Sequence, residues 1–275
     1  MTLTFSILTG CGKSQADIDS AVNTKIQEWM TRRTPQQRAM EAIQSDDPDD
    51  RRKLLSDVLK SNQARSEWAV KVFATIAKTD PDPQVRCMAI KGLRRSADDR
   101  VVEPLLMILN HKDHPKVAPP TPEVRWDATE VLSFMSDFGG VPVEHRDEVR
   151  RTLLRLVTED SDRNVRICAA HGLGNYPSLD VLSVLIQVLE DRDFAVRYEA
   201  AKSLRKLTGQ DYEYDADAWR AWLAAHRTLP TTSPEGQEPE VMGDRAAPKN
   251  LWERTKEGTR NLFLMWQGER KEGTE

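Results

Sequence analysis

The segment Asp162-Arg163-Asn164-Val165-Arg166-Ile167-Cys168-Ala169-Ala170 recurs with variations along the chain. Aligned on the arginine, related copies occupy residues 82–89, 122–128 and 193–201, and a weaker copy occupies residues 47–52. Consecutive arginines are 31 to 41 residues apart. Self-similarity at such a period predicts a stack of repeated structural units.

Each copy marks the beginning of a helix. Aspartate supplies an N-cap acceptor and proline is tolerated in the first turn. The valine before the arginine, the alanine three residues after it and the leucine seven residues after it fall on one helical stripe. A second apolar segment, such as residues 101–109 or 181–189, lies between the copies. A single helix pair cannot bury its own apolar face, whereas a stack of pairs can.

This pattern resembles the HEAT repeat over residues 47–227. The resemblance implies an all-α fold: a right-handed, armadillo-like α-solenoid of about five HEAT-like helix pairs, with capping helices and a disordered C-terminal linker. It also implies that aspartate and arginine form a ladder between repeats, through Asp82, Arg86, Arg125, Asp162, Arg166, Asp193 and Arg197. The copy at 122–128 has no aspartate at the matching position, which leaves its ladder contact in doubt.

Composition excludes several classes of protein. The chain has 275 residues, 44 Asp+Glu against 40 Lys+Arg, and only 3 cysteines. No stretch approaches the ~18 consecutive apolar residues of a membrane-spanning helix. A formal net charge of −4 argues against a nucleic-acid partner, because such binding needs a surplus of basic side chains.

The N-terminus resembles a bacterial lipobox. Leu8-Thr9-Gly10-Cys11 follows a short apolar run, as in lipoproteins whose cysteine takes a diacylglycerol, although there is no basic segment before the run. Residues 1–11 are therefore interpreted as a truncated lipoprotein-type signal with Cys11 as the lipidation site. The alternative is an ordinary, unmodified N-terminus.

The remaining segments flank the solenoid. Residues 15–46 predict N-terminal helices, and residues 207–223 predict a terminal cap with Trp219 and Trp222 over the end of the stack. Residues 228–249 contain four prolines and few large apolar side chains, which is typical of a disordered linker. Residues 250–267 predict an amphipathic helix, which could dock on the solenoid, bind a partner or lie on a membrane surface.

The sequence contains few motifs that are typical of enzymes. His111-Lys112-Asp113-His114 could offer metal ligands, but no CxxC or HExxH motif accompanies it, so we expect a solvated loop, no metal and no cofactor. Cys87 and Cys168 lie two repeats apart, and we expect two buried thiols without a disulfide. HEAT-like bilin lyases and base-excision glycosylases exist, so an enzyme remains an alternative. It would require a cleft with converging carboxylates, and the linear sequence shows no such cluster.

The second helices of the pairs carry the candidate partner-binding residues. The resemblance to HEAT repeats implies that these second helices line the concave surface of the solenoid. The candidate residues on them are Trp126, Tyr198, Lys91, Glu130, His171 and Lys202. Core packing is the alternative role for the two aromatic residues. The sequence thus predicts a non-catalytic scaffold for a protein or peptide partner. It would be held at the periplasmic face of a bacterial envelope membrane if Cys11 is lipidated; the alternative is a soluble cytoplasmic adaptor.

Overall fold

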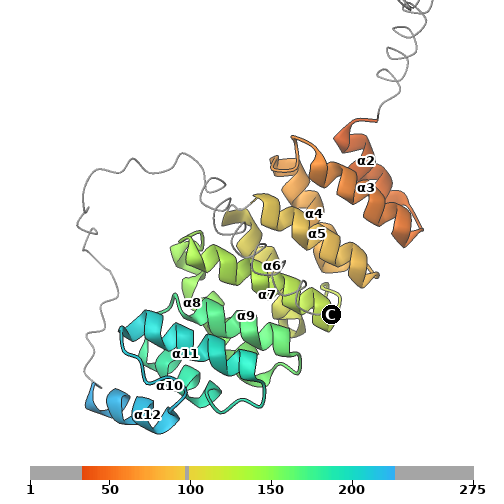
Figure 1. Cartoon of the computed structure of the whole chain (residues 1–275). Helices are drawn as coiled ribbons and strands as arrows, with labels where there is room; N and C mark the ends of the chain where they lie inside the picture. Colours follow the sequence, from red (N-terminus) through yellow and green to blue (C-terminus); the bar gives the residue numbers. More distant parts are fainter. Residues whose placement is uncertain (1–32, 97–98, 227–275) are drawn as a thin grey trace, which may run out of the picture.

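The computed structural model describes residues 33–96 and 99–226, which form a curved stack of helix pairs (Figure 1). The described residues contain no β-strand. Five pairs follow one another, as the sequence predicts: α2 (Pro35–Gln44) with α3 (Pro48–Lys60), α4 (Glu67–Thr79) with α5 (Pro83–Ser96), α6 (Val102–Leu109) with α7 (Pro122–Asp137), α8 (Val143–Glu159) with α9 (Arg163–Leu173), and α10 (Leu179–Val188) with α11 (Phe194–Thr208).

A further helix, α12 (Ala216–Ala225), packs on α10 at the end of the stack. Two short 3-10 turns, η1 (Asp99–Val101) and η2 (His111–Asp113), flank α6. The Trp219 side chain of α12 is fully buried and meets Tyr212 edge-on at 5.0 Å between ring centroids. This places Trp219 in the capping position that the sequence predicts for it.

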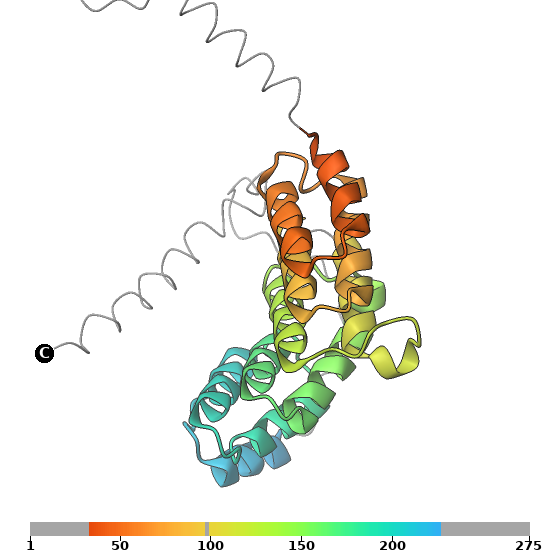
Figure 2. The ribbon, with the colours of Figure 1, turned by 90° about the vertical axis from the view of Figure 1, so that its right-hand side faces the viewer.

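The helices form two layers. The first helices of the pairs make an outer layer (α2, α4, α6, α8, α10 and α12), and the second helices make an inner layer (α3, α5, α7, α9 and α11). Figure 2 shows the stack bending toward the inner layer. The lipobox at residues 1–11, the linker at 228–249 and the helix predicted at 250–267 lie outside the described residues.

The inner helices begin and pack as their sequence predicts. Side chains of Asp47, Asp162 and Asp193 accept hydrogen bonds from backbone N–H groups in the first turn of α3, α9 and α11. The predicted valine, alanine and leucine stripe is fully buried in four helices, as Val85, Ala89, Leu93, Val124, Ala128, Leu132, Val165, Ala169, Leu173, Val196, Ala200 and Leu204. The repeated motif therefore fixes both the start and the buried face of each inner helix.

Small residues let the inner helices approach closely. A Cβ added at Gly172 of α9 would lie 2.6 Å from Ser133 Oγ of α7, and one at Gly174 would lie 2.9 Å from Ser203 Oγ of α11. Both serines donate hydrogen bonds to backbone carbonyls of α9: Ser133 to Cys168 at 2.6 Å and Ser203 to Ala170 at 2.8 Å. Glycine and serine together thus join α7, α9 and α11 at close range.

Candidate binding surface on the inner layer

Arginines near the start of the inner helices link each pair to the next. Arg51 Nε and Nη2 lie 2.9 and 3.0 Å from the two carboxylate oxygens of Asp80, which ends α4. The same two-pronged arrangement joins Arg125 to Asp160, at 2.7 and 2.9 Å, and Arg166 to Asp191, at 2.9 and 3.2 Å. Each aspartate belongs to the segment that leads into the next inner helix, so the pairing fixes the spacing of successive repeats.

The acids of this ladder are not the ones that the sequence predicted. Asp82 and Asp162 cap their own helices: Asp82 accepts from the N–H groups of Gln84 and Val85, and Asp162 accepts from those of Asn164 and Val165. Asp193 caps α11 through the Ala195 N–H. It also meets Arg163 at 3.3 Å, but not a ladder arginine.

The true ladder acids lie two residues earlier, because the carboxylate must reach back toward the preceding pair. Asp80, Asp160 and Asp191 also accept the backbone N–H two residues ahead, at 2.8 to 2.9 Å, which holds each one in place. A sequence signal for them exists: Asp-x-Asp-x-x-Val-Arg occurs three times, at 80–86, 160–166 and 191–197.

The ladder is interrupted at two arginines. Six residues before Arg125, where an aspartate would be expected, the chain has Pro119. Arg86 therefore donates to the backbone carbonyls of Ala77 and Pro119, at 2.8 and 3.0 Å, and its Nη2 has no hydrogen-bond partner. Burial lowers the pKa of this guanidinium. Arg197, in the last inner helix, binds the Asp191 carbonyl and lies over the ring of Phe194.

Two of the residues that directly follow a ladder arginine, Cys87 and Trp126, lie beside the next inner helix. Cys87 lies beside Asp127 of α7, whose charge adds to burial in raising the pKa of the thiol, and Trp126 lies beside Cys168 of α9. Trp126 is 41% exposed and its counterpart Tyr198 is 43% exposed. These two predicted anchors therefore lie at equivalent positions of α7 and α11, on the surface and not in the core.

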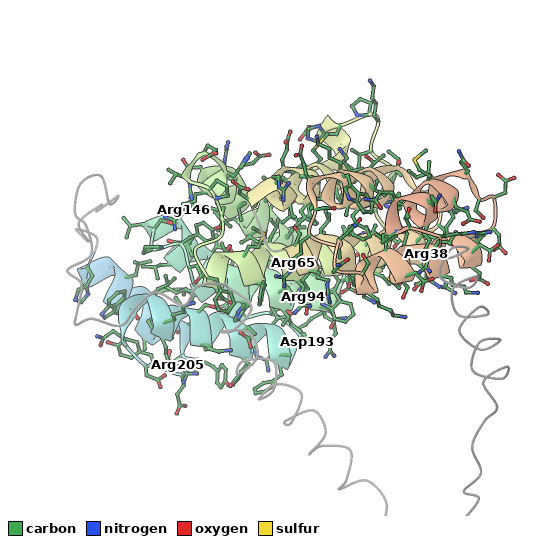
Figure 3. The ribbon with its side chains drawn as sticks, turned by 90° about the horizontal axis from the view of Figure 1, so that it is seen from above. Arg38, Arg65, Arg94, Arg146, Asp193 and Arg205 are labelled. Carbon is green, nitrogen blue, oxygen red and sulfur yellow. The ribbon has the colours of Figure 1, made fainter. Side chains whose placement is uncertain are left out.

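The other predicted binding residues also lie on the inner helices, and three of them form ion pairs. Glu130 pairs with Arg94 of α5 at 2.7 Å, and Lys202 pairs with Glu199 at 3.3 Å. Lys91 is exposed on α5. Figure 3, seen from above, shows Arg94 and Arg205 on the inner side of the stack and Arg146 of α8 on the opposite side.

His171 is the centre of a charge network that joins three inner helices. Its Nε2 lies 2.8 Å from Asp137 at the end of α7, and its Nδ1 lies 3.2 Å from Glu199 of α11. The hydrogen bonds to Asp137 and then Glu199 raise the pKa of His171 to about 9. Burial opposes ionisation of Asp137, yet the hydrogen bonds from His171 and Asn175 lower its pKa to about 2. At neutral pH, His171 is therefore a cation held between two carboxylates.

Both described cysteines are unsuited to nucleophilic chemistry. They are free thiols, Cys87 buried and Cys168 partly buried. Burial raises the pKa of each to about 12. They are therefore protonated at neutral pH and pack as small apolar side chains.

Residues 33–96 and 99–226 contain neither a cluster of potential metal ligands nor a membrane-spanning helix. No group of three or more His, Cys, Asp or Glu side chains in that part of the chain could hold a metal ion. Within the same residues, no helix is both long and apolar enough to cross a lipid bilayer.

A comparison with models of known protein families also identifies repeated helix pairs in this chain. A model of HEAT repeats matches residues 37–133 and 150–218, more than half of the chain. The chain belongs to the HEAT-repeat family. Its match begins inside α2, so this helix is the first member of the first HEAT pair.

The solved structures to which the chain is similar include two engineered proteins. One, described only as an engineered protein, is 19% identical and covers 71% of this chain and 88% of its own, with a TM-score of 0.47. A designed armadillo repeat protein is 14% identical and covers 73% of this chain and 94% of its own, with a TM-score of 0.46. No curated protein matches the chain.

Sequence reasoning missed part of this HEAT surface. Phe194 and Tyr214 are 59% and 41% exposed and meet at 5.7 Å between ring centroids. Phe194 directly follows the N-cap aspartate of α11, where the repeat motif gives no indication of its surroundings. Asp137 was also missed, because only the packing of α7 on α9 brings it to His171.

Proposed function

We propose that this HEAT-repeat protein is a non-catalytic scaffold that binds a segment of a partner protein along α7, α9 and α11. The observation that carries the proposal is the exposure of Trp126 and Tyr198 at equivalent positions of two inner helices. Exposed aromatic side chains on a rigid surface are typical anchors of protein interfaces. Membership of the family supports an interaction role of this kind.

The spacing of the anchors suits a short extended peptide. Packed helices are about 8–10 Å apart, so Trp126 and Tyr198, two helices apart, are separated by roughly 16–20 Å. An extended chain covers this span in about six residues. Between the anchors lies Ile167, the residue at the same position of α9, which is partly buried. The partner would place apolar side chains at both ends of this row.

The charged residues of the inner layer are better suited to orienting a bound peptide than to increasing its affinity. Glu130, His171 and Lys202 each have an oppositely charged partner within the inner layer. A ligand gains little from a charge that is already neutralised. We therefore assign the main binding energy to Trp126 and Tyr198, and hydrogen bonding at the edge of the peptide to Lys91, Glu130, His171 and Lys202.

A selection from a random peptide library on the full chain tests this proposal. The dissociation constants of the selected peptides are measured with the wild type and with Trp126→Ala. Loss of one of the two aromatic anchors should weaken binding by at least about tenfold. Ile43→Ala is the control, because Ile43 is 51% exposed on the outer helix α2. Peptides that bind both variants equally well would contradict the assignment.

We further propose that Cys11 anchors the protein to a bacterial envelope membrane. The support is the Leu8-Thr9-Gly10-Cys11 segment, which lies outside the described residues. Intact masses of the wild type and of Cys11→Ala, each expressed in the native host and recovered from the membrane and soluble fractions, provide the test. A diacylglycerol mass on the wild type alone is expected. An unmodified, soluble wild type would instead support the cytoplasmic adaptor.

A further inference from the structure

The last inner helix has an open side. α12 packs on α10 and so occupies the place of the first helix of a sixth pair. Within residues 33–96 and 99–226, no second helix follows it. At Cys87 and Trp126, the residue after the ladder arginine lies beside the next inner helix, near Asp127 and Cys168 respectively. For Tyr198 of α11, the described chain provides no such helix.

Aromatic side chains gather at this open side. Phe194, Tyr198 and Tyr214 are 59%, 43% and 41% exposed. The ring centroid of Phe194 lies 6.4 Å from that of Tyr198 and 5.7 Å from that of Tyr214. Arg197 lies over the Phe194 ring at 5.6 Å. Arg197 occupies the ladder position, but no described segment follows with the aspartate that would continue the ladder.

We propose that residues 251–266 of the same chain supply the missing sixth inner helix and dock on Phe194, Tyr198 and Tyr214. This segment is as long as an inner helix, since it has 16 residues and α7 also has 16. Five of its seven large apolar residues fall on one helical side: Leu251, Trp252, Leu262, Phe263 and Trp266. Leu264 and Met265 fall on other sides.

The length of the chain favours this occupant over others. Twenty-four residues, 227–250, separate the described end of α12 from the segment. A flexible chain of this length spans roughly 25–30 Å on average. The ten residues of α12 extend only about 15 Å from the loop that holds Tyr214. Attachment by such a linker gives an effective concentration of about 1 mM, which favours the segment over a free ligand.

Charge also favours it. The segment carries three basic residues (Arg254, Lys256 and Arg260) against two acidic ones. The loop before α12 and its first turn carry four acids: Asp211, Glu213, Asp215 and Asp217. Of these, Asp211 pairs with Arg205 and Asp217 pairs with Arg220, while Asp215 caps α12. Among these four acids, Glu213 is the one whose carboxylate is neither ion-paired nor capping a helix, so it is the group at the docking surface that can meet a basic residue of the segment.

Docking would cover Tyr198, one of the two anchors of the proposed peptide row. This consequence rests on the proposed function, whereas the docking itself does not.

Photo-crosslinking in the full chain tests the docking without any partner. Phe194→p-benzoylphenylalanine places the probe on the patch, and Val143→p-benzoylphenylalanine is the matched control, since Val143 is 81% exposed at the start of outer helix α8. After irradiation at low protein concentration, peptide mapping should find the Phe194 probe joined to residues 251–266 of the same chain. The Val143 probe should give no such product.

The segment's apolar side chains are tested in the same assay. Leu262→Ala combined with Trp266→Ala should lower the yield of this product by at least about tenfold, because each change removes a large apolar side chain from the contact. Val241→Ala combined with Met242→Ala, in the linker, should leave the yield unchanged. A probe at Tyr214 repeats the experiment should the Phe194 probe disturb folding.

Three results would overturn the proposal. They are the absence of a product with 251–266 from both patch probes, an unchanged yield in the Leu262→Ala and Trp266→Ala variant, and products that form only between two copies. None of these results depends on Trp126 or on the selected peptides. A failure of the docking is therefore distinguishable from a failure of the peptide-binding function.

Discussion

Arg51 of α3 binds both carboxylate oxygens of Asp80, a residue 29 positions later in the chain. Both side chains are about nine-tenths buried. Removal of the acid would leave a buried guanidinium without a counter-charge. We therefore expect Asp80→Ala to lower the free energy of unfolding by about 3 kcal/mol.

Urea unfolding followed by circular dichroism measures this loss. Asp49→Ala is the control, since Asp49 is well exposed and pairs with the exposed Arg52, and we expect a change of less than about 1 kcal/mol. Equal effects of the two substitutions would contradict a structural role for the ladder.

The gap in the ladder can be filled. Pro119 stands where the repeat motif has an aspartate, and Arg86 keeps an unpartnered Nη2. Pro119→Asp should provide a carboxylate for this guanidinium and raise the free energy of unfolding by about 1 kcal/mol. Pro119→Asn has nearly the same shape without the charge and should give no such gain. A gain of equal size in both variants would point to the removal of proline and not to the ion pair.

Close packing of the inner layer makes Gly172 sensitive to a single methyl group. A Cβ there would lie 2.6 Å from Ser133 Oγ and 3.0 Å from Leu153 Cδ1. Overpacking of this kind costs about 1–3 kcal/mol, so Gly172→Ala should lower the thermal midpoint by several degrees. At Gly140 the nearest atom to an added Cβ is 3.5 Å away, so Gly140→Ala should change the midpoint far less. Differential scanning calorimetry of the two variants compares them directly.

The charge network around His171 predicts a dependence of stability on pH. The pKa of His171 is raised from 6.5 to about 9 in the folded protein, by Asp137 and Glu199. The folded state therefore binds the proton more tightly. The stabilisation is fully present below pH 6.5 and is lost as the pH rises through about 9.

Unfolding free energies at pH 6, 7.5 and 9.5 test this prediction. We expect the wild type to lose about 1–2 kcal/mol across this window, a figure reduced for the partial exposure of the ring. His171→Gln has no group that titrates there and should lose less, which separates His171 from Lys202, Lys206 and the other charges nearby. Parallel curves for the two proteins would exclude His171 as the source.

The repeat motif by itself determined the helix pairs. Val165, Ala169 and Leu173, and their counterparts in the other copies, are spaced for one buried stripe, and Asp162 caps the helix that carries them. Such features depend on neighbours within one or two turns, so the linear sequence contains all the information they need. The same spacing turned Trp126 and Tyr198 partly toward the concave surface but left core packing open as their role, and the structure leaves both exposed.

Only the tertiary structure decided which side chains meet across repeats. Asp80 and Asp82 are both aspartates near the start of α5, and the sequence alone predicted the wrong one as the ladder acid. The pairing of Arg51 with Asp80, the position of His171 between Asp137 and Glu199, and the aromatic patch at Phe194 depend on how the inner helices are rotated and spaced. That geometry comes from packing between residues about 30 positions apart, to which a local pattern is insensitive.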